Sequence, residues 1–152
     1  MHLVTYLQFQ QASESTLASS YTTVCQGHVA DADVHWMTGR FARQCEIHAD
    51  ALQPVLARLD TPGEPVPERL HVQGLTTIRA GLAGLLRDLQ ELYQLVSLVD
   101  TTWSLVGQAA QAIRDWELIK IVEGCAAQTT AQLDWLRMRM QMTAPQALLV
   151  AV

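Results

Sequence analysis

The sequence is short of charged side chains. Asp, Glu, Lys and Arg make up 16% of the 152 residues, against about 25% in typical soluble domains. The formal net charge is −5 at pH 7, which argues against a nucleic-acid partner because phosphate binding needs a basic surface. The shortage of charge indicates that another subunit covers some apolar surface. We therefore expect a homodimer or a higher homo-oligomer, with a different protein partner as the alternative.

Cysteine and long apolar runs are scarce as well. Cys25, Cys45 and Cys125 are too few and too scattered for a disulfide framework, and reduced thiols fit a cytoplasmic protein. The longest apolar run, 95–106, is broken by Asp100 and falls short of the roughly 20 residues that span a bilayer. The first residues lack the basic and apolar segments of a secretory signal. These features predict a soluble, cytoplasmic protein without a membrane span.

Strand signals and catalytic motifs are also missing from the sequence. No stretch alternates apolar and polar residues between tight-turn dipeptides, so nothing predicts a β-strand. No glycine loop suited to phosphate and no nucleophile-turn motif is present. We therefore expect an all-α protein and assign no catalytic residue.

The sequence does contain helical periodicity. Apolar residues recur at alternating steps of three and four, the spacing of a buried helix face. This pattern predicts helices roughly over 3–28, 33–59, 69–113 and 115–142, with the third either continuous or broken near 100–107. The proline-rich segment 61–67 separates the second helix from the third. The expected architecture is a single domain over 1–152, a four-helix bundle of two helical hairpins joined by a Pro-rich crossover loop, with an apolar tail, 144–152, that docks on the body or on a partner.

Several polar residues fall where this periodicity predicts core. A turn near residue 31 places Glu14 across from His48 in the first hairpin. A turn near 114–115 places Asp100 across from Thr129, and Cys125 across from the following turn of the third helix. An unpaired carboxylate is costly in a bundle core, so each of these polar levels must be hydrogen-bonded or bound to a metal.

The order of helices resembles the ferritin-like superfamily, above all its small stress-associated members. The likeness covers roughly residues 10–142 and includes the alanine-rich stretch 108–115, where the third helix runs into the fourth. In metal-binding members, two helices each supply one Glu and two others each supply Glu-x-x-His, whose spacing places both side chains on one helix face.

The resemblance implies a metal-ligand set with several departures from that pattern. Glu14 takes the place of the first-helix Glu, and Cys45-Glu46-Ile47-His48 takes that of the first Glu-x-x-His, with Cys45 replacing its Glu. Asp100 is the acid nearest the expected third-helix position. Cys125-Ala126-Ala127-Gln128 replaces the second Glu-x-x-His and lacks both of its ligands. Thiolates are softer than carboxylates and favour other metals, so the site is degenerate. The candidate metal residues are Glu14, Cys45, His48, Asp100 and Cys125.

Simpler interpretations compete with a metal site. Glu14 and His48 can form a buried hydrogen bond between two helices, and free cysteines are usually buried apolar residues. A zinc site from Cys25, His28, Cys45 and His48 has a suitable ligand set, but it requires a turn at 38–39 that would interrupt the second helix. The four tryptophans are interpreted as packing or interface residues.

Three functional hypotheses follow from the sequence. The first is a non-catalytic, homo-oligomeric structural or interaction protein, with a link to stress implied by the resemblance alone. It predicts no cofactor. The second is a metal-binding or redox protein with a partial site for a divalent metal (iron, manganese or zinc) in the bundle core. The third is a small-molecule binder with its site between the helices.

Overall fold

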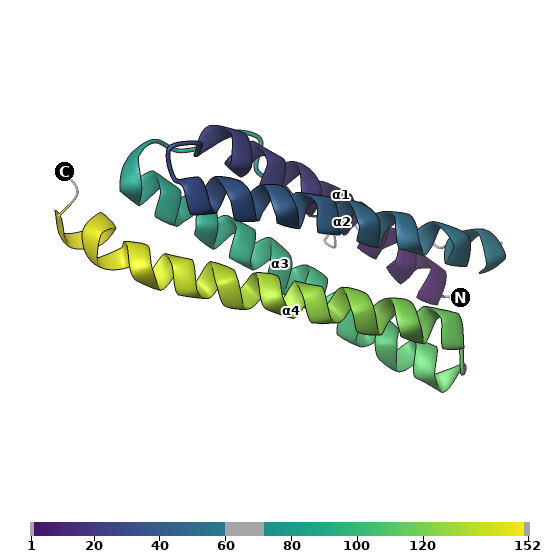
Figure 1. Cartoon of the computed structure of the whole chain (residues 1–152). Coiled ribbons are helices and arrows are strands. Elements are labelled where there is room, and N and C mark those ends of the chain that lie inside the picture. The colour runs from purple at the N-terminus through teal and green to yellow at the C-terminus, as the bar shows by residue number, and fades with distance from the viewer. Residues whose placement is uncertain (1, 60–71, 151–152) are drawn as a thin grey trace.

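The computed structural model describes residues 2–59 and 72–150, and within them the chain is helical without strands (Figure 1). Four long helices are α1 (His2–Gly27), α2 (Ala32–Leu59), α3 (Gly81–Ala112) and α4 (Trp116–Pro145). A short π-helical turn, η1 (Gln146–Val150), follows α4. The predicted all-α, four-helix architecture is confirmed. The proline-rich segment 61–67 lies outside the described residues.

The helices pack as two antiparallel hairpins. α1 pairs with α2 and α3 pairs with α4, while α1 also packs against α3 and α2 against α4 (Figure 1). Asp115 caps α4 as predicted, because its carboxylate accepts a hydrogen bond from the Leu118 amide at 3.1 Å. Large apolar side chains fill the space between the hairpins, among them Leu7, Leu17, Leu52, Leu89, Leu92, Trp103 and Leu136.

The third helix begins later than the sequence predicts. α3 starts at Gly81 rather than near residue 69, and residues 72–80 form an extended segment that we call the strap. The predicted helix over residues 72–80 is therefore wrong. Gly81 has a φ of 75°, a left-handed conformation that favours glycine and interrupts a helix there. Leu75 is still buried, but its amide donates to Ser20 Oγ at 3.1 Å instead of to a helix carbonyl.

The strap lies close to the two helices that it crosses. A side chain at Gly74 would place its Cβ 2.6 Å from Ser20 Oγ of α1. A side chain at Gly84 of α3 would place its Cβ 2.7 Å from the carbonyl carbon of Arg79. Both contacts need glycine, because each distance is shorter than a Cβ atom tolerates. The strap thereby connects α1 to the start of α3.

The structure also shows whether α3 is continuous and where α4 ends. α3 continues without a break through 100–107, where the hydroxyls of Thr101 and Thr102 donate to carbonyls one turn earlier. α4 reaches Pro145, beyond the predicted end at residue 142. Of the apolar tail, Ala147 is buried against the body, whereas residues 148–150 are exposed and 151–152 are not among the described residues.

Candidate functional site

One hydrogen-bonded group joins all four helices at mid-depth in the bundle. It contains Glu14 of α1, His48 of α2, Trp103 of α3 and Gln128 of α4, and we call it the polar centre. Glu14 Oε1 lies 3.0 Å from His48 Nδ1 and accepts the Trp103 indole N–H at 2.8 Å. His48 Nε2 lies 2.7 Å from Gln128 Oε1. The predicted contact between Glu14 and His48 is confirmed, and both side chains are buried.

The surroundings of His48 in the polar centre favour the protonated form of its imidazole. Burial lowers the pKa of its imidazole, but the hydrogen bond to Glu14, the negative charge of Glu14 and the hydrogen bond to Gln128 together raise it above the ordinary 6.5. Both ring nitrogens face acceptor oxygens, and an imidazole can donate from both only when it is protonated. The charge of the Glu14 carboxylate is therefore met by His48.

A second polar group lies one turn further along α4. Gln132 Oε1 accepts the Tyr21 hydroxyl at 3.0 Å, and Gln132 Nε2 donates to Gln44 Oε1 at 3.1 Å. The Cys45 thiol contacts Gln132 Oε1 at 3.9 Å. Burial raises the pKa of the Tyr21 hydroxyl well above 10.0, with smaller contributions from Cys45 and Glu14. These contacts pair neutral groups and leave no reactive side chain.

The two core cysteines are neutral thiols. Burial and the nearby Glu14 carboxylate raise the pKa of Cys45 well above 9.0. The same two causes raise the pKa of Cys125 to about 12. Thiolates, not thiols, act as nucleophiles and metal ligands. Both cysteines are buried as predicted, in a form that suits packing better than chemistry.

Asp100 does not reach the polar centre. It is only partly buried, and it forms no hydrogen bond or ion pair with the residues that the structure describes. Its pKa is raised, because partial burial disfavours the charged form. The helix face expected to present Asp100 presents Trp103 instead. The expectation that Asp100 points inward at the level of Glu14 is therefore wrong.

The four residues of the zinc alternative do not come together and instead contact other partners. His28 Nε2 lies 2.8 Å from Asp88 Oδ2, whereas His48 contacts Glu14. The Cys25 thiol donates to the His35 carbonyl at 3.2 Å, and His35 Nδ1 donates to the Cys25 carbonyl at 2.7 Å. The turn that would bring both Cys-x-x-His steps together is absent, because α2 runs unbroken from Ala32.

The donors of the polar centre do not fit a metal ion as they are arranged. Within 2–59 and 72–150, no three His, Cys, Asp or Glu side chains are grouped closely enough to hold one. A metal would need a free lone pair on His48, but both of its nitrogens are hydrogen-bonded. The neutral thiols would each have to lose a proton. The arrangement suits a buried ion pair that fixes the register of four helices.

A second buried carboxylate was missed by sequence reasoning. Asp88 of α3 is fully buried, and besides His28 it accepts the Arg79 amide at 3.0 Å and the Arg79 guanidinium at 2.6 Å. Arg79 also contacts Glu91 at 2.6 Å. We call Asp88, His28, Arg79 and Glu91 the Asp88 cluster. A signal was present, since Asp88 lies three residues after Leu85 and thus near the buried face of the helix.

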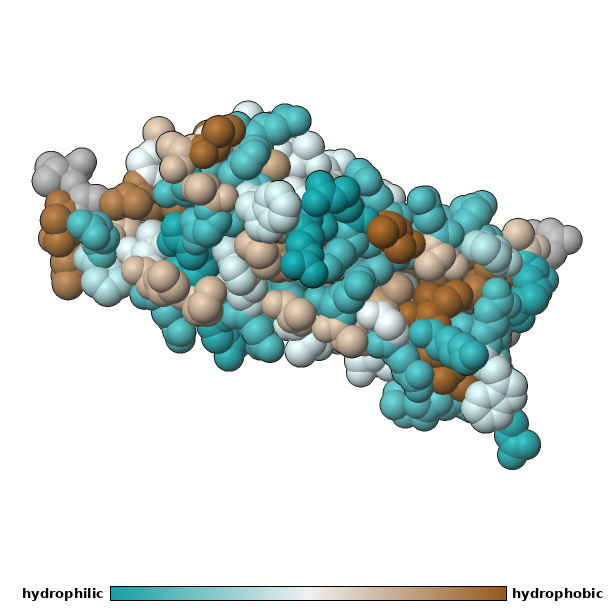
Figure 2. All heavy atoms as spheres, viewed as in Figure 1, coloured by the Kyte–Doolittle hydropathy of each residue, from teal (hydrophilic) through white to brown (hydrophobic). Residues whose placement is uncertain are grey.

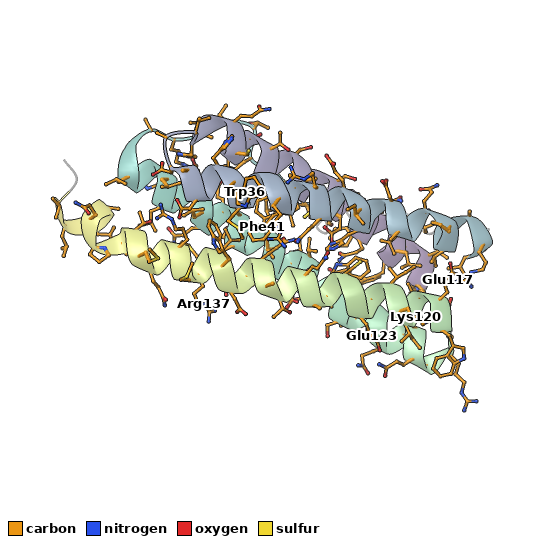
Figure 3. The ribbon with its side chains drawn as sticks, viewed as in Figure 1. Trp36, Phe41, Glu117, Lys120, Glu123 and Arg137 are labelled. Atoms are coloured by element: carbon orange, nitrogen blue, oxygen red, sulfur yellow. The ribbon has the colours of Figure 1, made fainter. Side chains whose placement is uncertain are left out.

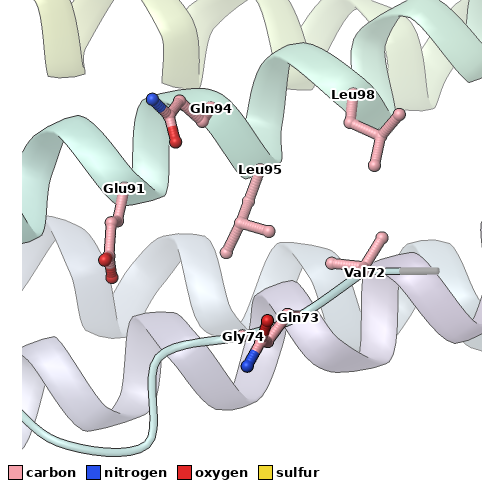
Figure 4. A pocket seen from close by; sticks show the side chains of 7 residues that line it. All are labelled: Val72, Gln73, Gly74, Glu91, Gln94, Leu95 and Leu98. Atoms are coloured by element: carbon pink, nitrogen blue, oxygen red, sulfur yellow. The ribbon is translucent and has the colours of Figure 1, made fainter. Parts of the chain in front are cut away.

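A hollow of about 440 Å³ separates the strap from α3 (Figure 4). Glu91, Leu95 and Leu98 of α3 point toward residues 72–74, and Gln94 of α3 also lines the hollow. Glu91 is the charged member, and Arg79 already neutralises it. The hollow therefore offers no unpaired charge to a ligand.

The raised pKa of His48 predicts a pH dependence of stability. Because the folded pKa exceeds the ordinary 6.5, protonation of His48 stabilises the fold fully below that pH. This contribution is lost as the pH rises through the folded pKa. We expect urea midpoints of the wild type to fall over this window more steeply than those of His48→Gln, which lacks the titrating ring. NMR titration of the His48 ring checks the direction, and a midpoint below 6.5 would contradict it.

No helix among the described residues is long and apolar enough to cross a bilayer. The resemblance to the ferritin-like superfamily stays a prediction. A scan of protein-family models, a search of curated proteins and a search of solved structures each found no match to this chain.

Proposed function

We propose that this chain is a non-catalytic helical bundle that acts as a structural or interaction protein and associates with further copies of itself. The polar centre supports the first half of this proposal. Its charged pair, Glu14 and His48, is formed between two of its own side chains. The hydrogen bonds of these two residues to Trp103 and Gln128 join the four helices. The nearby thiols are neutral, so neither Cys45 nor Cys125 is an activated nucleophile.

The exposed apolar surface carries the second half of the proposal. Trp36 of α2 and Trp116 of α4 are 66% and 71% exposed, and Leu149 of η1 is 84% exposed. Other exposed apolar side chains are Val29, Ile47, Leu105, Ile113, Met138, Met142, Leu148 and Val150. Tryptophan and methionine are enriched in protein interfaces.

Apolar surface is unevenly distributed over the face of the molecule drawn in Figure 2. Figure 2 shows apolar surface at the end formed by η1 and along the boundary between α2 and the first half of α4. Charged side chains such as Glu123 and Arg137 point away from the bundle along α4, whereas Phe41 lies between α2 and α4 (Figure 3). Burying a large apolar side chain contributes about 1.5–3 kcal/mol, so two or three of them favour association measurably.

Sedimentation equilibrium over a range of protein concentrations tests self-association. We expect a dimer or a larger oligomer for the wild type. In Leu148→Ser/Leu149→Ser, which removes two apolar side chains from η1, we expect the dissociation constant to rise about tenfold or more. Gln146→Ser, which changes an exposed polar side chain of the same turn, is the matched control and should leave the dissociation constant unchanged. A wild type that stays monomeric at every concentration would refute the proposal.

The metal-binding alternative receives one supporting observation. Glu14 Oε2 is buried and accepts no hydrogen bond from a described residue. Metal analysis of protein purified without a His tag separates the two hypotheses. Stoichiometric iron, manganese or zinc that disappears in Glu14→Ala/His48→Ala would favour the alternative over a metal-free structural role.

A further inference from the structure

Two oxygen atoms in the core have no donor among the described residues. They are Gln10 Oε1 and Glu14 Oε2, and both side chains are fully buried. Leaving a buried acceptor without a hydrogen-bond donor destabilises a folded protein. Two such atoms at one level of a closely packed bundle therefore indicate a ligand that donates hydrogen bonds.

Both oxygens belong to side chains on the same face of α1. Gln10 and Glu14 are one turn apart on α1, a spacing that makes their side chains neighbours. Gln10 Nε2 donates to the Val99 carbonyl at 3.0 Å, and Glu14 Oε1 accepts from His48 and Trp103. Each side chain is thus fixed by one of its polar atoms, and the other atom is left for a common ligand.

Helix direction brings the two fixed side chains together. α1 and α3 are antiparallel, since His28 contacts Asp88 while Glu14 contacts Trp103. Along two antiparallel helices, residue numbers that rise on one helix fall on the other. From the Gln10–Val99 hydrogen bond to the Glu14–Trp103 hydrogen bond, the residue number rises on both α1 and α3, so the two bonds cross. The two side chains therefore reach over the same turn of α3, between Val99 and Trp103.

The charges around these oxygens favour a neutral ligand. His48 already meets the charge of Glu14, so a cation would leave an unbalanced charge in the core. The thiol of Cys45 lies beside the Glu14 carboxylate and is neutral. A thiol is a weak donor that can bond to a lone pair of a water molecule.

We propose that one buried water molecule bridges Gln10 Oε1 and Glu14 Oε2 and is a constant part of the polar centre. It donates one hydrogen to each oxygen, which satisfies both acceptors. Ordered buried waters usually have about three polar partners, and these two oxygens with a neighbouring thiol supply that number. The proposal does not depend on whether the protein self-associates.

Two experiments test the proposal. One is a crystal structure at a resolution that shows ordered water, and the other is NMR of the wild type in solution. We expect density for one water within hydrogen-bond distance of both oxygens, and a cross-peak between water and the Trp103 indole proton. In Gln10→Met, which keeps the side-chain length but removes the acceptor, this cross-peak should be lost. Gln11→Met is the matched control, because Gln11 bonds to Ala49 on the α2 side, and it should retain the peak.

Three results would overturn the proposal. The first is a direct contact between Gln10 and Glu14 with no water between them. The second is an unchanged cross-peak in Gln10→Met. The third is a stabilisation by ammonium chloride that sodium chloride does not reproduce and that Gln10→Met removes, since this would identify a cation as the ligand. If Gln10→Met does not fold, the wild-type crystal structure and spectrum decide alone.

Discussion

Replacing Glu14 with alanine is expected to lower the free energy of unfolding by about 3–5 kcal/mol. Glu14 is fully buried and is the acceptor for both His48 and Trp103. Its removal leaves the imidazolium of His48 without a counter-charge and the indole N–H of Trp103 without an acceptor. Urea denaturation followed by circular dichroism measures the loss, and the NMR signal of the Trp103 indole N–H reports the changed surroundings of the indole.

Two variants separate the role of the carboxylate from a general effect of mutation. Glu46→Ala removes an exposed carboxylate two residues before His48, and we expect a change within about 0.5 kcal/mol. Glu14→Gln keeps an acceptor oxygen for Trp103 but removes the charge, so its loss should be smaller than that of Glu14→Ala. A Glu14→Ala protein as stable as Glu46→Ala would show that the ion pair contributes nothing.

The contact between Glu14 and His48 is predictable from the sequence because it lies within one hairpin. Residues 28–31 form a short turn between α1 and α2, and a short turn fixes which residues of two antiparallel helices face each other. The apolar spacing of each helix then decides which side chains point inward. The same reasoning explains why Cys45 was correctly expected to be buried beside them.

The partners of this pair in the other hairpin were not predictable in the same way. Trp103 and Gln128 belong to α3 and α4, whose position against the first hairpin is not set by a short turn. Successive residues on a helix point about 100° apart, so an error of less than one turn changes which side chain faces inward. Val99 and Trp103 share the buried face of α3, and Asp100 is rotated away from it.

The strap shows a second limit of periodicity. Leu75 and Ile78 continue the apolar spacing of α3, and for this reason the sequence predicts a longer helix. The contacts that hold residues 72–80 extended come from distant residues, namely Ser20 and Asp88. Local spacing does not report such contacts, and tertiary structure overrides it here.

Replacing Asp88 with alanine is expected to destabilise the strap more than the rest of the bundle, with a global loss on the order of 3 kcal/mol. Asp88 accepts hydrogen bonds from the Arg79 amide, the Arg79 guanidinium and His28. His28 is buried and would lose its hydrogen-bond partner, whereas the Arg79 side chain is 41% exposed and would be partly compensated by water. Urea denaturation measures the global loss.

Amide hydrogen exchange distinguishes a local effect of Asp88→Ala from general destabilisation. The amides of Leu75 and Arg79 donate to Ser20 and Asp88, so both should exchange faster in the variant than amides at the centre of α2. Asp88→Asn keeps one acceptor oxygen and should retain part of the protection. Asp50→Ala, at an exposed site on α2, should change neither measurement. If exchange at Leu75 and Arg79 stayed at the wild-type rate, the Asp88 cluster would not be what attaches the strap to α3, and the close contacts at Gly74 and Gly84 would have to hold it alone.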